Sequence, residues 1–208
     1  VKTDIEGGIH RITLNRPEVM NALNRDLRRE LTAALLAGHS GRVIVLTAAG
    51  RGFCSGQDLS DASGLDEAGF EATLNNEYVP MIRAITEAPV PVIAAMNGVA
   101  AEAGANFAQG CDMAIAARSA SFIQAFSKIG LVPDCGGTWL LPRLLGRARA
   151  LGLALTGDKL SADAAAEMGL IWQCVEDAVL MDTALALAHK LAAMPVKALA
   201  VTRQAFDA

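Results

Sequence analysis

Residues 42–59, RVIVLTAAGRGFCSGQDL, hold the pattern that decides the fold: a continuous apolar run that passes directly into a loop of small and polar residues. An apolar run without polar alternation is typical of a strand that is buried on both faces of a parallel sheet. The pattern returns at 91–98, PVIAAMNG, where a second such run ends in a loop. Buried parallel strands need helices packed on their faces, so the sequence predicts a layered α/β fold.

The flanking sequence supplies the other elements of such a fold. Hydrophobic periodicity and turn residues predict further strands at 9–14, 113–116 and 121–126. Apolar spacing predicts helices, the first with Asn21 as its cap, at 21–37, 69–87, 103–111, 138–145, 147–156, 161–168 and 180–193. The interval between the two buried runs suggests repeated ββα units.

Composition limits the classes of protein to which the chain can belong. It has 208 residues, 52% of them apolar and 4% aromatic, with a net charge of −4, which suits one domain and gives no reason to expect nucleic acid as a partner. No basic head precedes an apolar run near residue 1, and no apolar stretch is long enough to span a bilayer. We therefore expect a soluble cytoplasmic protein without a membrane partner.

Cysteine and histidine spacing gives no sign of a metal site. The four cysteines form no CxxC pair, and the three histidines are scattered, so we expect reduced thiols and no bound metal.

Three loops carry residues suited to chemistry. Gly56 would allow a turn that frees the N–H of Gln57, and the small residues of 97–105 would let a ligand approach a helix N-terminus. Asp134 lies just before a predicted helix. Each loop also has an ordinary explanation, namely a surface turn, tight helix–sheet packing and a helix cap.

Together the loops provide the minimum equipment for removing a proton next to a thioester carbonyl. Two backbone N–H groups can stabilise the developing enolate oxygen, and one carboxylate can move the proton.

Four segments, taken in order, carry a resemblance to a known family: NRPEVMNAL at 15–23, GRGFCSGQDL at 50–59, NGVAAEAGANFA at 97–108 and GLVPDCGGTWLLPRLLG at 130–146. These segments resemble the crotonase superfamily, the enoyl-CoA hydratase/isomerase group, and the likeness covers essentially the whole chain. It is closest to the isomerase branch that serves phenylacetate degradation.

The resemblance implies a crotonase (ClpP-like) spiral of ββα units with helices packed outside. It implies a core domain at 1–193 and, at 194–208, the incomplete start of a C-terminal helical region that forms trimer contacts. The expected partner is an acyl-CoA thioester, coenzyme A being part of the substrate and no other cofactor being needed. A homotrimer or dimer of trimers is the expected assembly.

The resemblance also implies roles for individual residues. Gln57 and Ala103 would supply the two N–H donors of an oxyanion hole, and Asp134 would be the catalytic acid/base. Residues expected to line the substrate site, with Arg16 either contacting phosphate or simply solvated, are Arg16, Phe53, Ser55, Gly56, Asp58, Leu59, Gly104, Phe126, Pro133 and Trp139.

Two departures from the family pattern bear on activity. Asn106 and Phe126 stand where hydratases of the family carry two glutamates, which favours isomerisation over hydration. Glu102 stands where the family usually has glycine, beside the second donor, so its charge could oppose an enolate. A hydratase and a catalytically weak acyl-CoA-binding scaffold remain the alternatives. Whether apolar neighbours raise the pKa of Asp134 or a helix dipole lowers it stays open.

Overall fold

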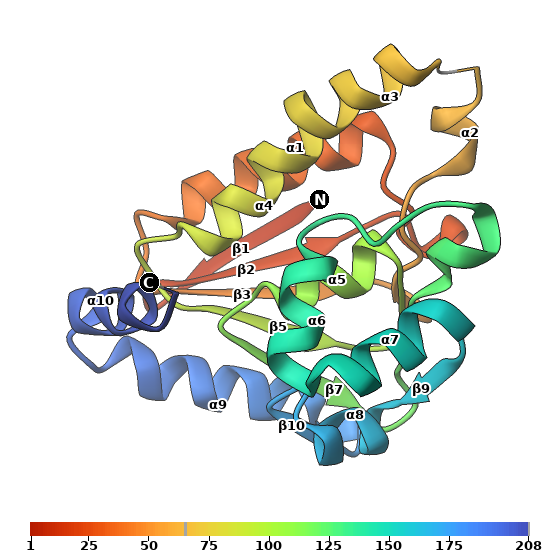
Figure 1. The fold of residues 1–208 in the computed structure, drawn as a ribbon. Coiled ribbons are helices and arrows are strands. Elements are labelled where there is room, and N and C mark those ends of the chain that lie inside the picture. Colours follow the sequence, from red (N-terminus) through yellow and green to blue (C-terminus); the bar gives the residue numbers. More distant parts are fainter. Residues whose placement is uncertain (65, 208) are drawn as a thin grey trace.

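The computed structural model describes residues 1–64 and 66–207, and its centre is a six-stranded sheet (Figure 1). The strand order is β1-β2-β3-β5-β7-β10, with an antiparallel β1–β2 hairpin at one edge and parallel pairing elsewhere. The strands are β1 (Lys2–Glu6), β2 (Ile9–Leu14), β3 (Val43–Ala48), β5 (Val92–Met96), β7 (Met113–Ala117) and β10 (Gln173–Val175). Every residue of β3 and β5 is buried, as expected for central strands covered on both faces.

A second, smaller sheet lies beyond the ends of the central strands. Its order is β4-β6-β8-β9, and its strands are β4 (Gly52–Cys54), β6 (Val99–Ala101), β8 (Ser121–Ile123) and β9 (Lys159–Ser161). Each of β3, β5 and β7 is followed in the chain by a strand of this second sheet, and helices follow β4, β6 and β8. This succession confirms the expected ββα units.

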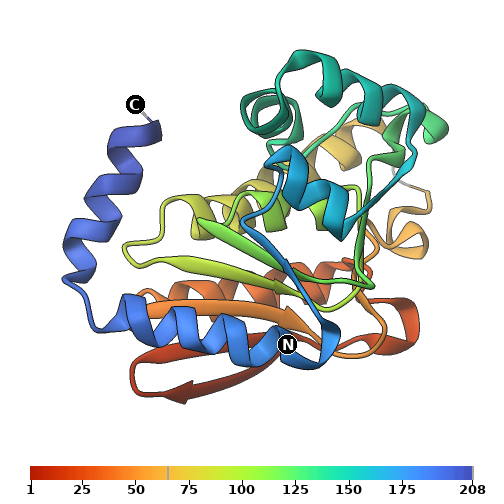
Figure 2. The same cartoon turned by 90° about the horizontal axis from the view of Figure 1, so that it is seen from below.

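Helices cover the outside of the sheets. They are α1 (Arg25–Gly38), α2 (Leu59–Ala62), α3 (Glu67–Thr73), α4 (Val79–Thr86), α5 (Ala103–Gln109), α6 (Gly137–Leu145), α7 (Arg147–Thr156), α8 (Ala162–Met168), α9 (Leu180–Ala192) and α10 (Val196–Asp207). A π-helix at Leu74–Tyr78 joins α3 to α4, and 3-10 turns occur at Pro17–Val19, Ala125–Ile129 and Asp177–Val179. Helix α9 packs on β3, β5 and β7, while α1 and α4 lie together on the other side (Figure 1). Figure 2 shows α10 turning away from the end of α9.

Most predicted elements are confirmed, and two need correction. The first long helix begins at Arg25 with Asn24 as its N-cap, because the Asn24 side chain accepts from the N–H of Leu27 at 2.9 Å. Asn21, the predicted cap, is instead buried with a φ of 56°, and its amide bonds the carbonyls of Ala49 and Gly52. The strand expected at 121–126 ends at Ile123 and continues as a 3-10 turn.

The lengths of the helices and the placement of the His, Cys, Asp and Glu side chains bear on membranes and metals. Within the described part of the chain, no single helix has the length and apolar composition to cross a bilayer. The bent pair Asp177–Ala192 and Val196–Phe206 meets those two criteria jointly. Over the same residues, no three His, Cys, Asp or Glu side chains gather in a way that could hold a metal ion.

Candidate active site

The loops after β4 and β6 touch each other through glycine positions. A β-carbon added at Gly56, whose φ is +91°, would lie 3.1 Å from the Glu102 Cβ and 3.1 Å from its Oε2. One added at Gly104 would lie 2.4 Å from the carbonyl oxygen of Cys54, closer than real Cβ contacts come. Glycine is therefore required for the first turn of α5 to pack directly on β4, and this packing joins the two loops predicted to supply donors.

The backbone of the first loop leaves the Gln57 N–H free. Leu23 runs beside this loop, donating its N–H to the Gly56 carbonyl at 2.8 Å and accepting from the Asp58 N–H at 3.2 Å. Backbone groups of successive residues in an extended segment point to opposite sides. Because residues 56 and 58 bond Leu23, the N–H of Gln57 points away from Leu23, and within the described residues it donates no backbone hydrogen bond.

The second donor lies at the start of α5. Ala103 is the first residue of this helix, and the opening N–H groups of a helix have no acceptor inside it. The preceding N–H, that of Glu102, is bonded to the Ile123 carbonyl at 2.8 Å, which fixes the peptide that leads into the helix. The Ala103 side chain is 1% exposed, so this N–H lies below the molecular surface.

Asp134 faces inward and does not cap α6. The N-cap of that helix is Gly136, with no side-chain cap, and Oδ1 of Asp134 is buried with no hydrogen-bond partner in the described chain. Burial raises the pKa of Asp134 to about 6, the neighbouring Cys135 thiol lowers it, and the negative charge of Glu102 raises it further. Burial is the largest of these causes, and it acts in the direction expected for apolar surroundings.

Two apolar neighbours of Asp134 in the sequence lie largely at the surface, since Leu131 is 45% exposed and Val132 is 76% exposed. The added charge of Glu102 was not predicted as a cause.

Asn106 holds the backbone at Asp134. Its Nδ2 donates to the Asp134 carbonyl at 2.9 Å, and its Oδ1 accepts from Gln124 Nε2 at 2.7 Å. Asn106 is fully buried, and a β-carbon at Gly137 would lie 2.4 Å from its Nδ2. The amide therefore holds the 130–139 loop in place through the backbone of Asp134.

Glu102 combines an unfavourable backbone conformation with a half-buried carboxyl group. Its φ of 51° and ψ of −125° suit glycine, and a side chain held there typically costs about 1–3 kcal/mol. Its carboxyl group is half-buried, burial raises its pKa, and in the described part of the chain it makes no side-chain hydrogen bond or ion pair. Strain and desolvation thus coincide beside the two donors.

The other predicted substrate-site residues lie in varied surroundings. Arg16 pairs with Asp58 at 2.8 Å and bonds the Ala22 carbonyl, so its guanidinium already has internal partners. Phe53 is buried against Phe107, with ring centroids 5.5 Å apart, and Phe126 is also buried. The remaining positions are Ser55, which donates to the Val19 carbonyl; Leu59, which is exposed; Pro133, which is half-buried; and Trp139, which stacks under Arg143 at 3.9 Å.

Sequence reasoning missed Arg28 and Tyr78. Arg28 is 1% exposed and bonds Glu77 and Asp61, while the Tyr78 hydroxyl donates to Gln57 Oε1. The available signal was an arginine on the apolar stripe of the first helix, three residues before Leu31 and seven before Leu35, both of which are buried.

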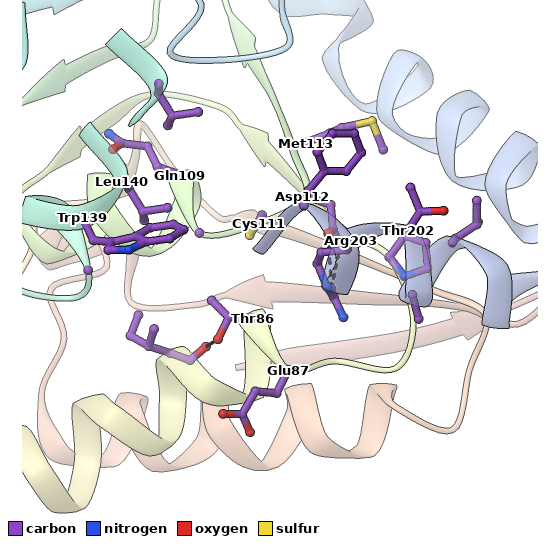
Figure 3. Close-up of a pocket in the computed structure, with 18 of the residues that line it drawn as sticks. Thr86, Glu87, Gln109, Cys111, Asp112, Met113, Trp139, Leu140, Thr202 and Arg203 are labelled. Atoms are coloured by element: carbon purple, nitrogen blue, oxygen red, sulfur yellow. Dashed lines mark hydrogen bonds and ion pairs between the residues drawn. The ribbon is translucent and has the colours of Figure 1, made fainter. Parts of the chain in front are cut away.

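A cavity of about 830 Å³ adjoins the 130–139 loop (Figure 3). Cys135, Gly136 and Trp139 form one wall, and α10 contributes Thr202 and Arg203 on another. Its lining is mainly apolar, and its size falls in the range of small-molecule sites. Gln57, Ala103 and Asp134 do not line it, so it is a neighbour of the donor and carboxyl groups and does not contain them.

Comparisons with known proteins agree on one group. The family model described as enoyl-CoA hydratase/isomerase matches residues 4–208. The chain is 53% identical to a "probable enoyl-CoA hydratase" of Rhodobacter capsulatus and 49% identical to 1,2-epoxyphenylacetyl-CoA isomerase of Escherichia coli, covering all of this chain and 81% of each relative. The crystal structure of an enoyl-CoA hydratase from Bacillus anthracis matches with a TM-score of 0.94 at 33% identity, over 99% of this chain and 81% of that one.

Proposed function

The chain belongs to the enoyl-CoA hydratase/isomerase family of the crotonase superfamily, and on that premise we propose that it isomerises an acyl-CoA thioester with Asp134 as acid and base. The substrate we propose is ring-1,2-epoxyphenylacetyl-CoA or a related enoyl-CoA. The observation that carries the proposal is the inward-facing, desolvated carboxyl of Asp134 on a loop whose backbone Asn106 holds.

In the proposed reaction the thioester oxygen accepts hydrogen bonds from the N–H groups of Gln57 and Ala103. The Asp134 carboxylate takes a proton from the carbon beside the carbonyl, and the electron pair moves into the enolate that the two donors stabilise. The Asp134 carboxyl then returns the proton to another carbon of the conjugated system. No water or further cofactor is consumed.

The identity of the acyl group is supported by the relatives. The Escherichia coli relative is named for the epoxyphenylacetyl thioester. The cavity next to Cys135 and Gly136 offers apolar room for an acyl group that extends past Asp134.

Hydration is the second candidate, and the Rhodobacter capsulatus relative named as a hydratase favours it. The two activities differ in a measurable way, because only hydration adds water to crotonyl-CoA. Hydration of crotonyl-CoA at a rate equal to or above α-proton exchange would replace our proposal with this one.

Replacing Asp134 by Asn tests the proposal. We expect solvent-deuterium exchange at the α-carbon of aryl- and alkenyl-CoA thioesters, followed by NMR, to fall by about 100-fold or more because general acid–base catalysis is removed. Coenzyme A thioester binding, measured by calorimetry, is expected to persist. Undiminished exchange in Asp134→Asn would rule out the assigned role.

The pH profile gives the same test a second readout. The Asp134 carboxyl must be ionised to act as a base, and its pKa is raised to about 6. The exchange rate at low substrate concentration is therefore expected to rise with pH through about 6 and to level off above it.

Folding stability is expected to show the opposite trend. Because the folded pKa of Asp134 lies above that of the unfolded chain, stability from this group is present at low pH and is lost as pH rises through about 6.

A further inference from the structure

The Gln57 side chain is held by two other side chains. The Tyr78 hydroxyl donates to its Oε1, and Arg28 Nη1 lies 3.4 Å from the same atom. Gln57 therefore carries the first proposed donor on its backbone and an anchor on its side chain. A constraint on the anchor restrains the direction of the N–H.

Arg28 links the Gln57 side chain to the backbone of Leu23, which is hydrogen-bonded to the Gln57 loop. Its Nη1 also donates to the Leu23 carbonyl at 2.6 Å, and that carbonyl accepts from the Asp58 N–H. Arg28 is in turn neutralised by Glu77 at 2.6 Å and Asp61 at 2.8 Å. A single buried guanidinium thus contacts both the Gln57 side chain and the segment against which the Gln57 loop is aligned.

Tyr78 is placed by an irregular turn of helix. It is the last residue of the π-helix Leu74–Tyr78, and single π-turns occur frequently at functional sites. The ring is 3% exposed and lies 5.0 Å from the Arg28 guanidinium. Burial raises the pKa of the Tyr78 hydroxyl, the Arg28 cation lowers it, and Asp134 raises it further, so the hydroxyl stays a neutral donor.

We propose that Tyr78, supported by Arg28, is a positioning residue for catalysis: its hydroxyl holds the Gln57 side chain and thereby fixes the Gln57 N–H on the acyl oxygen. The inference rests on the proposed function and deepens it. Tyr78 does not move a proton and does not need to touch the substrate. Its effect is expected on the transition state. The charge on the acyl oxygen is largest there, so a misdirected N–H weakens the stabilisation most at that point.

Two variants and their combination test the proposal by α-proton exchange. Tyr78→Phe removes only the hydroxyl, and Gln57→Leu removes the acceptor Oε1, together with the 3.5 Å bond from Nε2 to the Asp58 carbonyl, while keeping the backbone N–H. We expect each to lower kcat about tenfold with KM changed less than twofold. The double variant is expected to be no slower than the slower single variant, because both changes break one contact.

Thr73→Val is the matched control. It removes a hydroxyl from the neighbouring turn of helix, where Thr73 Oγ1 donates to the Gly69 carbonyl of its own helix at 2.9 Å. Its kcat and KM are expected to match those of the wild type. Thermal unfolding of every variant, followed by circular dichroism, separates a loss of folded enzyme from a loss of turnover.

The outcomes separate this inference from the proposed function. If the wild type and Thr73→Val catalyse no exchange on any thioester, the proposed function fails and the inference with it. If both are active and Tyr78→Phe keeps the wild-type kcat, the inference alone is overturned. Losses that multiply in the double variant also overturn it, since they would show that the two side chains act independently.

Discussion

The two peptides that carry the proposed donors are held in place by different kinds of interaction. The peptide at Gln57 is aligned by hydrogen bonds to Leu23 and anchored through its side chain to Tyr78 and Arg28. The peptide at Ala103 follows Glu102, a strained residue whose carboxyl group has no polar partner in the described structure. The contrast teaches that two donors of one site can owe their positions to different causes, one to a polar network and one to backbone packing around glycines.

Breaking the polar network gives the largest expected effect. Arg28→Met leaves Asp61 without this cation and Glu77 paired with Arg25 at 3.1 Å, and removing one partner of a buried ion pair typically costs about 3–5 kcal/mol, of which Arg25 offsets a part. We expect a loss of that size in urea denaturation. Arg83→Met, which removes an exposed pair with Glu87, serves as the control and is expected to change stability by less than about 1 kcal/mol. Equal losses in the two variants would contradict the role of Arg28 as the buried cation of this polar network.

Crowding the contact between the two loops gives the next largest effect. Gly56→Ala puts a β-carbon at a φ of +91° and 3.1 Å from Glu102, so we expect a loss of about 2–3 kcal/mol in unfolding free energy. In a Glu102→Gly background the side-chain contacts disappear, while the backbone strain and a 3.2 Å approach to the Ala101 carbonyl oxygen remain. The same substitution is then expected to cost about 1 kcal/mol less. Additive effects would show that the loops do not touch as described.

Relaxing the strained peptide gives the smallest effect and one of opposite sign. Glu102→Gly removes both an unfavourable φ and a half-buried charge, so we expect a gain of about 1 kcal/mol in stability and a higher kcat for α-proton exchange. Glu102→Gln separates the two causes, because it keeps the strain and removes the charge. It is expected to raise kcat with a smaller gain in stability than Glu102→Gly gives. A lower kcat in both variants would make Glu102 a participant in the reaction.

The sequence predicts those parts of the molecule that depend on local pattern. The buried runs that became β3 and β5 are unambiguous, and the glycine at 56 identifies its own turn. Asn21 was misassigned because asparagine suits both a cap and a left-handed turn, and only the contacts with Ala49 and Gly52 distinguish them. The short strands β6, β9 and β10 have too few residues to show a period.

The candidate site, like the fold, has residues that the sequence indicates and residues that only the structure reveals. Asp134 stands out in the sequence because it lies between a proline and two glycines, and its inward direction then follows from packing. The contacts of Tyr78 with Gln57 and of Arg28 with Asp61 join residues 21 and 33 positions apart. No local pattern reports such contacts, and a π-helix that rotates Tyr78 into place has no sequence signature of its own.

The hydrogen bond from Asn106 to the Asp134 backbone has a consequence for how this chain could evolve. A glutamate at 106 can accept hydrogen bonds when ionised but cannot donate one to the carbonyl at 134, so gaining a second carboxylate there would release the loop that carries the first. The one-carboxylate site proposed here and a two-carboxylate site would then be separated by an intermediate whose 130–139 loop has lost this support. A lineage could cross that gap only by first acquiring another support for the loop, which makes the order of substitutions as important as their identity.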